Sequence, residues 1–207
     1  MLIAAVALAG VVAVIASRGS DDNSATNAGT TDDASGSTAL AAAETRPVRV
    51  TGAALPRYAS EPDPAKGRPV PQVEGASFDG SPVAIEADGR AKVIVFVAHW
   101  CPHCQREVPR LSEYLQDNPM PADVDMITVA TGTTADRPNY PPSEWLEREK
   151  WPGPVLADSA DAKAAEAFGL SSYPFFVAVD KNGSVVARTS GELTTDQFAE
   201  LVGLARG

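Results

Sequence analysis

The chain has few cysteines and histidines and lacks clusters of basic residues. Its 207 residues include two cysteines and two histidines, and no block of Lys or Arg interrupts a composition whose formal net charge is −10 at pH 7. The lack of a cluster of basic residues argues against nucleic acid as a partner. A structural zinc site is excluded as well, because the two cysteines would need two further ligands that this composition does not supply.

Both cysteines lie in one short motif, Trp100-Cys101-Pro102-His103-Cys104, directly after the apolar run 93–97. A C-x-x-C pair beside a β-α-β pattern is typical of a thioredoxin-like redox motif. The sequence therefore predicts a redox-active dithiol at a strand-to-helix junction, and its predicted chemistry is thiol–disulfide exchange.

The N-terminal part does not have the composition of a folded domain. Residues 2–16 are an unbroken apolar run, short for a membrane span of about 20 residues and without a basic segment before it. We expect residues 1–17 to be an uncleaved membrane anchor, with a cleaved signal peptide as the alternative. No cysteine lies nearby, so attachment through a lipidated cysteine is excluded.

Residues 18–60 are expected to be a flexible tether followed by a Pro-rich approach, because Ser, Thr, Gly, Ala, Asn and Asp dominate its first part and bury little apolar surface. The folded domain is expected over residues 61–207. An apolar segment and a tether before a dithiol domain indicate an oxidising compartment. We expect the domain on the extracytoplasmic side of the cell membrane, held by the N-terminal segment, or else secreted.

The first half of the domain shows a hairpin, a buried strand and a helix. Segments 72–74 and 82–85 flank the turn signal Asp79-Gly80 and predict a β-hairpin. Residues 92–98 predict a central strand buried on both faces. A helix is expected from Pro102, with a kink at Pro109. Its apolar face is predicted to hold Val108, Leu111 and Leu115.

The second half supplies the remaining strands and helices. Residues 124–130 and 154–157 predict strands, separated by an insertion with a short helix at 143–150. A helix is expected at 159–168, capped by Ser159 and closed by Gly169. Strands 175–179 and 184–188 are expected to join through a type I′ turn at Asn182-Gly183. The last helix is expected from Thr194, which forms a capping-box pattern with Gln197.

This order predicts an α/β thioredoxin fold: a mixed central sheet flanked by helices, with an N-terminal β-hairpin and an insertion before the third core strand. At the first turn of the helix, unpaired N–H groups and the helix dipole favour a thiolate at Cys101, which is the predicted nucleophile. Cys104, one turn later and shielded, is the predicted resolving thiol.

The two residues between the cysteines are expected to tune the redox balance. Pro102 fits the first helical turn, and His103 can carry positive charge or donate a hydrogen bond towards the thiolate, so Pro-His favours an oxidising pair. Two other interpretations compete. An inert disulfide would constrain the unfolded chain very little, and a copper site formed by His99 and His103 with the thiolates would crowd all ligands into one short segment.

Three segments, Ala98 to Cys104, Glu107-Val108-Pro109 and Tyr173-Pro174-Phe175, resemble the TlpA-like (redoxin-type) thiol–disulfide oxidoreductases of bacterial envelopes, with a likeness from about Pro69 to Ala205. The resemblance implies that Pro174 is a cis-proline facing the dithiol. It also implies that Tyr173 pairs through its backbone with an extended substrate segment. Trp100 is expected to pack beside the dithiol and shape its access, with a purely structural role as the alternative.

By the same resemblance, Glu107 is the acid beside the thiols. It is expected to substitute for the buried aspartate that thioredoxin carries six residues before its first cysteine, where this chain has Val95.

The sequence thus predicts an enzyme that exchanges disulfides with envelope or secreted proteins through a mixed disulfide on Cys101. The resemblance favours a reductase recycled by a membrane redox partner, whereas the Pro-His dipeptide favours a DsbA-like disulfide donor. A copper-binding chaperone is the alternative from a different class. No cofactor and no resident metal are expected.

Overall fold

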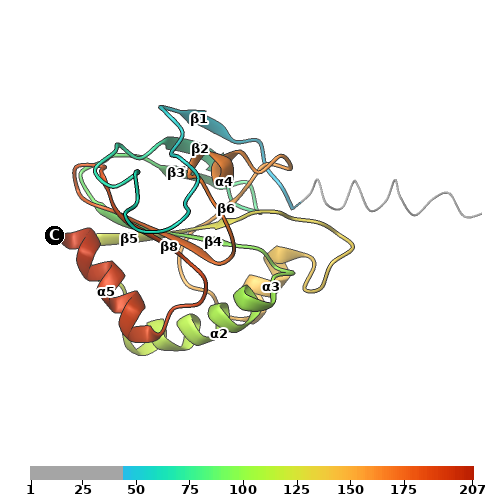
Figure 1. Ribbon diagram of the computed structural model, residues 1–207. Helices are drawn as coiled ribbons and strands as arrows, with labels where there is room; N and C mark the ends of the chain where they lie inside the picture. The colour runs from blue at the N-terminus through green and yellow to red at the C-terminus, as the bar shows by residue number, and fades with distance from the viewer. Residues whose placement is uncertain (1–43) are drawn as a thin grey trace, which may run out of the picture. The chain divides into compact units, whose positions relative to one another are not determined.

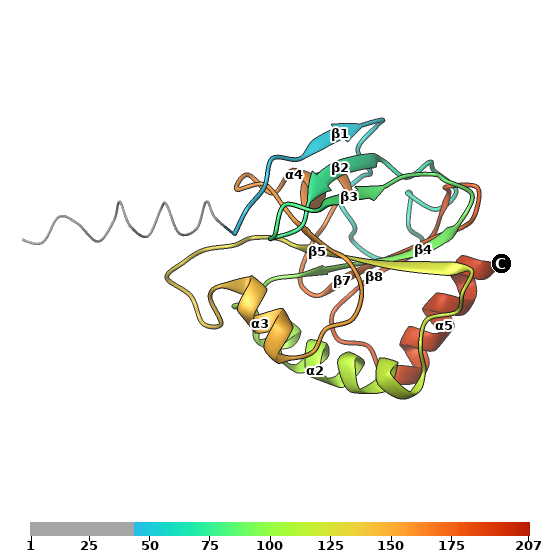
Figure 2. The same ribbon diagram turned by 180° about the vertical axis from the view of Figure 1, so that it is seen from behind.

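The computed structural model describes residues 44–207, which form two sheets and four helices (Figures 1 and 2). A small antiparallel sheet has the order β1-β2-β3, and the main sheet has the order β6-β5-β4-β7-β8. The main sheet is mixed, since β4 runs parallel to β5 and antiparallel to β7. The predicted thioredoxin fold with an N-terminal hairpin is confirmed. The strands are β1 (Arg49–Thr51), β2 (Gln72–Ala76), β3 (Pro82–Ile85), β4 (Ala91–Val97), β5 (Val124–Ala130), β6 (Val155–Ala157), β7 (Phe175–Val179) and β8 (Val185–Ser190).

The helices cover both faces of the main sheet. In Figures 1 and 2, α2, α3 and α5 lie on one face, and α4 lies with the small sheet on the other. α2 continues past Pro109 without a break, so that proline does not end the helix. α5 begins after Thr194 with the predicted capping box to Gln197. The helices are α2 (Pro102–Asp117), α3 (Pro142–Arg148), α4 (Lys163–Ala167) and α5 (Thr195–Arg206).

β4 is the centre of the molecule, and every one of its residues is buried. Its side chains alternate between two cores because successive residues of a strand point to opposite faces. Val93, Val95 and Val97 pack with the apolar faces of α2, α3 and α5. Ile94 and Phe96 pack on the other side, with the small sheet and α4. The prediction of a central strand buried on both faces is therefore confirmed.

The predicted helix at 159–168 is too long. Ala162 takes a left-handed conformation with φ 55°, and the helix begins only at Lys163. The Asp158 carboxylate accepts hydrogen bonds from the N–H groups of Ala164 and Ala165, at 2.9 and 3.1 Å, so the cap is an aspartate and not Ser159 alone. The predicted end is correct: Gly169 has φ 68°, and a Cβ there would lie 2.3 Å from the carbonyl oxygen of Pro56.

The turn between β7 and β8 also differs from its prediction. A type I′ turn needs positive φ at both central residues, but only Gly183 has it, at 78°, and Asn182 does not. The Asp180 carboxylate accepts N–H groups from Asn182 and Ser184 at 2.9 and 2.8 Å. This side chain replaces the type I′ arrangement with a longer turn that closes on a left-handed glycine.

The folded domain begins earlier than the expected boundary at residue 60. β1 pairs with β2, and Val48 and Leu55 are buried in the core beneath the small sheet. The ordering of this segment depends on long-range contacts that its composition does not show. The expected anchor at 1–17 and most of the expected tether lie outside the described residues. Within 44–207, no helix is both long and apolar enough to span a membrane.

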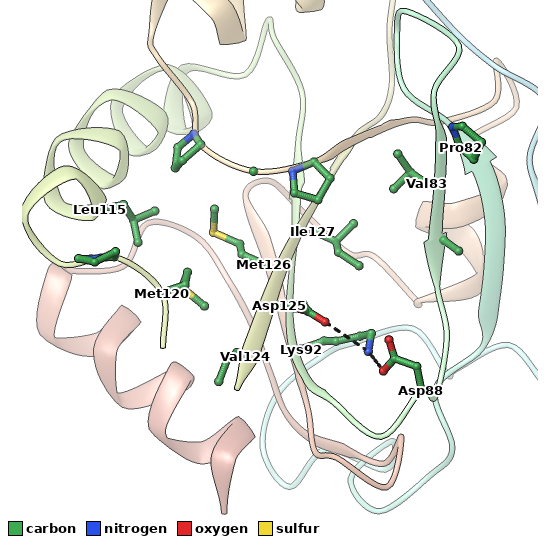
Figure 3. Close-up of a pocket in the computed structure, with 15 residues that line it drawn as sticks. Pro82, Val83, Asp88, Lys92, Leu115, Met120, Val124, Asp125, Met126 and Ile127 are labelled. Atoms are coloured by element: carbon green, nitrogen blue, oxygen red, sulfur yellow. Dashed lines mark hydrogen bonds and ion pairs between the residues drawn. The ribbon is translucent and has the colours of Figure 1, made fainter. Parts of the chain in front are cut away.

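A hollow of about 520 Å³ opens beside β3 and β5, near the end of α2 (Figure 3). Its walls are apolar around Met126 and Ile127, while Lys92 meets the carboxylates of Asp88 and Asp125 at one end. None of the predicted site residues lines it. The hollow is thus separate from the dithiol, and the predicted chemistry does not use it.

One buried ion pair holds the N-terminal approach to the main sheet. The Arg188 guanidinium donates to both carboxylate oxygens of Asp63 at 2.8 and 2.6 Å, and the two side chains are 0% and 1% exposed. The same guanidinium donates to the carbonyl oxygens of Pro56 and Phe168, each at 2.9 Å. The hydrogen bonds from Arg188 to the Asp63 carboxylate hold the pKa of Asp63 below its ordinary value. The pair stabilises the fold above that ordinary pKa, and this stabilisation is lost as the pH falls through the lowered value.

Replacing Asp63 by Asn should cost about 3–5 kcal/mol of unfolding free energy, because it leaves the Arg188 charge buried without a counter-ion. Denaturant unfolding at neutral pH measures this. The exposed pair of Arg49 and Glu74 is a matched control, and Glu74→Gln should cost at most about 1 kcal/mol. Equal losses in both variants would contradict the assignment.

Candidate active site

The dithiol lies where β4 passes into α2. Cys101 is the N-cap residue of α2, with φ −74° and ψ 122°, and its N–H donates to the carbonyl oxygen of Ala98 at 3.0 Å. Pro102 occupies the first helical position and is exposed. An N-cap position brings the Cys101 sulfur to the positive end of the helix, as the sequence predicts.

The two sulfurs differ in access to solvent. Cys101 is 6% exposed, whereas Cys104 is 0% exposed, and both are free thiols. Burial raises the pKa of Cys104 far above its ordinary value, and the charges of Cys101 and Glu107 raise it further. The N–H of Ala98 donates to the Cys104 sulfur at 3.4 Å. Cys104 is therefore a protonated, enclosed thiol, and Cys101 is the sulfur that a partner can reach.

Tyr173 and Pro174 lie opposite Cys101. β7 is antiparallel to β4, and the pairing of Phe96 with Phe175 brings the start of β7 to the end of β4. The carbonyl oxygen of Tyr173 consequently lies 3.8 Å from the Cys101 sulfur. The Tyr173–Pro174 peptide bond is cis, as the family resemblance implies.

Trp100 forms one wall beside the dithiol. Its indole Nε1 donates to the carbonyl oxygen of Gly132 at 2.7 Å, and its ring meets the Tyr173 ring edge-on, with centroids 5.7 Å apart. The Arg137 guanidinium lies 5.8 Å from the Trp100 ring centroid. At Gly132, with φ 64°, a Cβ would come within 2.9 Å of the Tyr173 hydroxyl. The insertion after β5 thus fixes the aromatic side of the site.

Glu107 lies on the buried face of α2, one turn after Cys104, and is 0% exposed. Its carboxylate accepts the Leu193 N–H at 3.1 and 3.2 Å and pairs with Arg110. Burial raises the pKa of Glu107 to about 7, in opposition to the Leu193 hydrogen bond and the Arg110 charge. Val95 is fully buried in the same core. The chain therefore has a buried acid that titrates near neutral pH close to the enclosed thiol.

His103 lies on the exposed side of α2 and bonds to a residue that the sequence did not single out. Its Nδ1 lies 2.7 Å from the carboxylate of Glu192, which stands in the turn between β8 and α5. Arg106 and Arg110 pair with the same carboxylate. No local spacing reveals Glu192, because it lies 89 residues along the chain from His103.

The second histidine is engaged in the fold. His99 is buried; its Nδ1 lies 2.7 Å from the carbonyl oxygen of Pro138, and its Nε2 accepts the Thr134 N–H at 3.3 Å. Both ring nitrogens therefore hold the insertion beside the site, which does not favour the copper alternative. No group of three or more His, Cys, Asp or Glu within residues 44–207 is arranged to hold a metal ion.

Comparisons with known proteins agree with this geometry. The family model described as Redoxin matches residues 65–204. Sporulation thiol-disulfide oxidoreductase A of Bacillus subtilis is 20% identical over 124 residues, which cover 60% of this chain and 73% of that protein. Thiol-disulfide oxidoreductase ResA of Halalkalibacterium halodurans is 24% identical over 120 residues, with 56% of this chain and 65% of that protein covered.

A solved structure has the same fold. The crystal structure of a thiol:disulfide interchange protein from Chlorobium tepidum matches with a TM-score of 0.56 and 22% identity, covering 69% of this chain and 99% of that chain. The family match spans most of the described domain and includes the dithiol, Glu107 and Pro174. The chain belongs to the Redoxin family and is a thiol–disulfide oxidoreductase.

Proposed function

We propose that this protein reduces disulfides in envelope or secreted proteins on the extracytoplasmic side of the cell membrane. The observation that carries the proposal is the unequal pair of thiols: a reachable Cys101 at a helix N-terminus, and an enclosed Cys104 close to an acid with a pKa of about 7. The apolar run at residues 2–16 supports a membrane location.

The first step is attack by the Cys101 thiolate on one sulfur of a substrate disulfide. A new S–S bond forms to Cys101, the substrate S–S bond breaks, and the leaving substrate thiolate takes a proton from water. The substrate segment lies extended along the backbone of Tyr173, whose carbonyl oxygen is 3.8 Å from the Cys101 sulfur. Trp100 and the Tyr173 ring bound this groove.

The second step resolves the mixed disulfide. Cys104 gives its proton to the ionised Glu107 carboxylate and attacks the Cys101 sulfur, and the substrate leaves as a second thiolate. The products are a doubly reduced substrate and a Cys101–Cys104 disulfide, so two electrons pass to the substrate. A membrane redox partner returns the two electrons and two protons to the dithiol. No cofactor enters either step.

Removal of either thiol should stop the cycle at a different point. Cys101→Ser should lower catalysed insulin reduction to the uncatalysed rate, because the only other thiol of the sequence, Cys104, is enclosed. Cys104→Ser should instead accumulate a mixed disulfide on Cys101, detected by mass spectrometry under non-reducing conditions. Turnover by Cys101→Ser would contradict the assignment of the nucleophile.

Replacing Glu107 by Gln should remove the pH dependence of the resolving step. In the unaltered protein this step should slow as the pH falls below about 7, because the carboxylate becomes protonated and no longer accepts the Cys104 proton. At about pH 8 the variant should be slower by roughly 100-fold, within the range for a general base. Single-turnover kinetics across this pH range measure the effect, and an unchanged profile would exclude Glu107 from the reaction.

The direction of electron flow is tested by the reduction potential of the Cys101–Cys104 couple. As a reductase, the protein should equilibrate with glutathione at a potential nearer to about −270 mV than to about −120 mV. The TlpA-like resemblance supports this direction, and the Pro-His dipeptide supports the oxidase alternative. A value near the upper figure would make the protein a disulfide donor.

A further inference from the structure

The Glu192 carboxylate contacts three basic side chains of α2. Glu192 Oε1 lies 2.7 Å from His103 Nδ1 and 2.5 Å from Arg106 Nη2, and Glu192 Oε2 lies 3.7 Å from Arg110 Nη1. The hydrogen bonds from Arg106 and His103 lower the pKa of Glu192 to about 2. The carboxylate is consequently charged at neutral pH.

These contacts determine how the His103 ring is used. Its Nδ1 lies between the Glu192 oxygen, at 2.7 Å, and the Arg106 nitrogen, at 2.8 Å. That nitrogen is therefore engaged by the ion cluster and not by the Cys101 sulfur. The negative charge of Glu192 also offsets the positive charge that His103 would present to the dithiol.

The cluster lies within electrostatic reach of the reacting sulfur. A negative charge at Cys101 raises the pKa of Arg106, so the guanidinium and the sulfur interact. Other charged groups near the dithiol are Glu107 and Arg110 from α2, which pair with each other, and Arg137, which lies over the Trp100 ring. Tyr173, with a pKa raised by burial, faces the dithiol from the segment before β7. Glu192, in the turn between β8 and α5, is thus the counter-ion of His103 and Arg106 beside the dithiol.

We propose that Glu192 sets the redox balance of the dithiol: by pairing with His103 and Arg106 it withdraws their positive charge from the Cys101 thiolate and makes the pair a weaker oxidant than its Pro-His dipeptide alone would give. The inference rests on the proposed function and accounts for a reductase with such a dipeptide. A dithiol is strongly oxidising when its reduced form is stabilised. Glu192 reduces that stabilisation and is a positioning residue, since it does not touch the sulfurs.

A double-mutant cycle tests the proposal, with Glu192→Gln, His103→Gln and the double variant in the full-length chain. Each protein is equilibrated with reduced and oxidised glutathione at about pH 6, below the ordinary imidazole pKa of about 6.5. In this equilibrium, two molecules of reduced glutathione reduce the protein disulfide to the dithiol and form one molecule of oxidised glutathione. One equilibrium constant therefore describes each variant. Ultraviolet absorbance of the thiolate gives a second readout.

Glu192→Gln should shift the equilibrium towards the reduced dithiol by at least about threefold, as expected for one partly screened charge across a protein surface. A tenfold shift would equal about 30 mV. His103→Gln alone should change it less than about twofold, because the Glu192 carboxylate already offsets the charge of the ring. In the Glu192→Gln background, the same His103 substitution should reverse most of the shift.

Glu200→Gln is the matched control, since it removes an equal charge from an exposed position on α5. It should leave the equilibrium within about twofold of the unaltered protein. Additive effects of Glu192 and His103, or an equal shift in the control, would overturn the inference alone. A chain that forms no reversible Cys101–Cys104 disulfide would overturn the proposed function as well.

Discussion

The two-sided burial of β4 is the constraint on which the rest of the structure depends. A strand whose seven residues are all buried must be covered on both faces. α2, α3 and α5 supply one cover, and the small sheet with α4 supplies the other. Because α2 must turn back at once to cover the strand from which it comes, its N-terminus lies directly after β4. The Cys101 sulfur is held at that turn.

The chemistry follows from the same arrangement. A helix that covers β4 has one face towards the core and one towards solvent, and the dithiol region uses both. Cys104 and Glu107 lie on the buried face, where desolvation keeps protons on acidic groups. His103 and Arg106 lie on the solvent face, where both side chains pair with Glu192. In the proposed mechanism, one helix thus places the proton-transfer groups on its buried face and the groups that tune the redox balance on its exposed face.

Sequence reasoning worked where the physical signal is local. β5 has its predicted bounds, and the Thr194 capping box forms as its spacing indicates, because both depend on neighbours within a few residues. The C-x-x-C pair was placed for the same reason. Within α4 the local signal misled, because the Asp158 carboxylate caps Ala164 and Ala165 and competes with the Ser159 cap.

Long-range partners were beyond reach of the sequence. Asp63 and Arg188 are 125 residues apart, and nothing in the sequence around either one distinguishes it from an ordinary surface charge. The burial of Glu107 is equally hidden, since it depends on the Leu193 N–H, 86 residues away. His103 was expected to act on the Cys101 thiolate, but its ring contacts Glu192, which comes from the turn after β8. Such contacts require the tertiary structure.

The enclosure of Cys104 has a consequence for how long any partner stays attached. A partner joined to Cys101 faces a second thiol that is fixed one helical turn away and shielded from competing reagents. Its release is an intramolecular event, so its rate is independent of the concentration of outside thiols. In the proposed mechanism, the lifetime of the mixed disulfide is therefore set by the protein itself, and a thiol-poor environment leaves that lifetime unchanged.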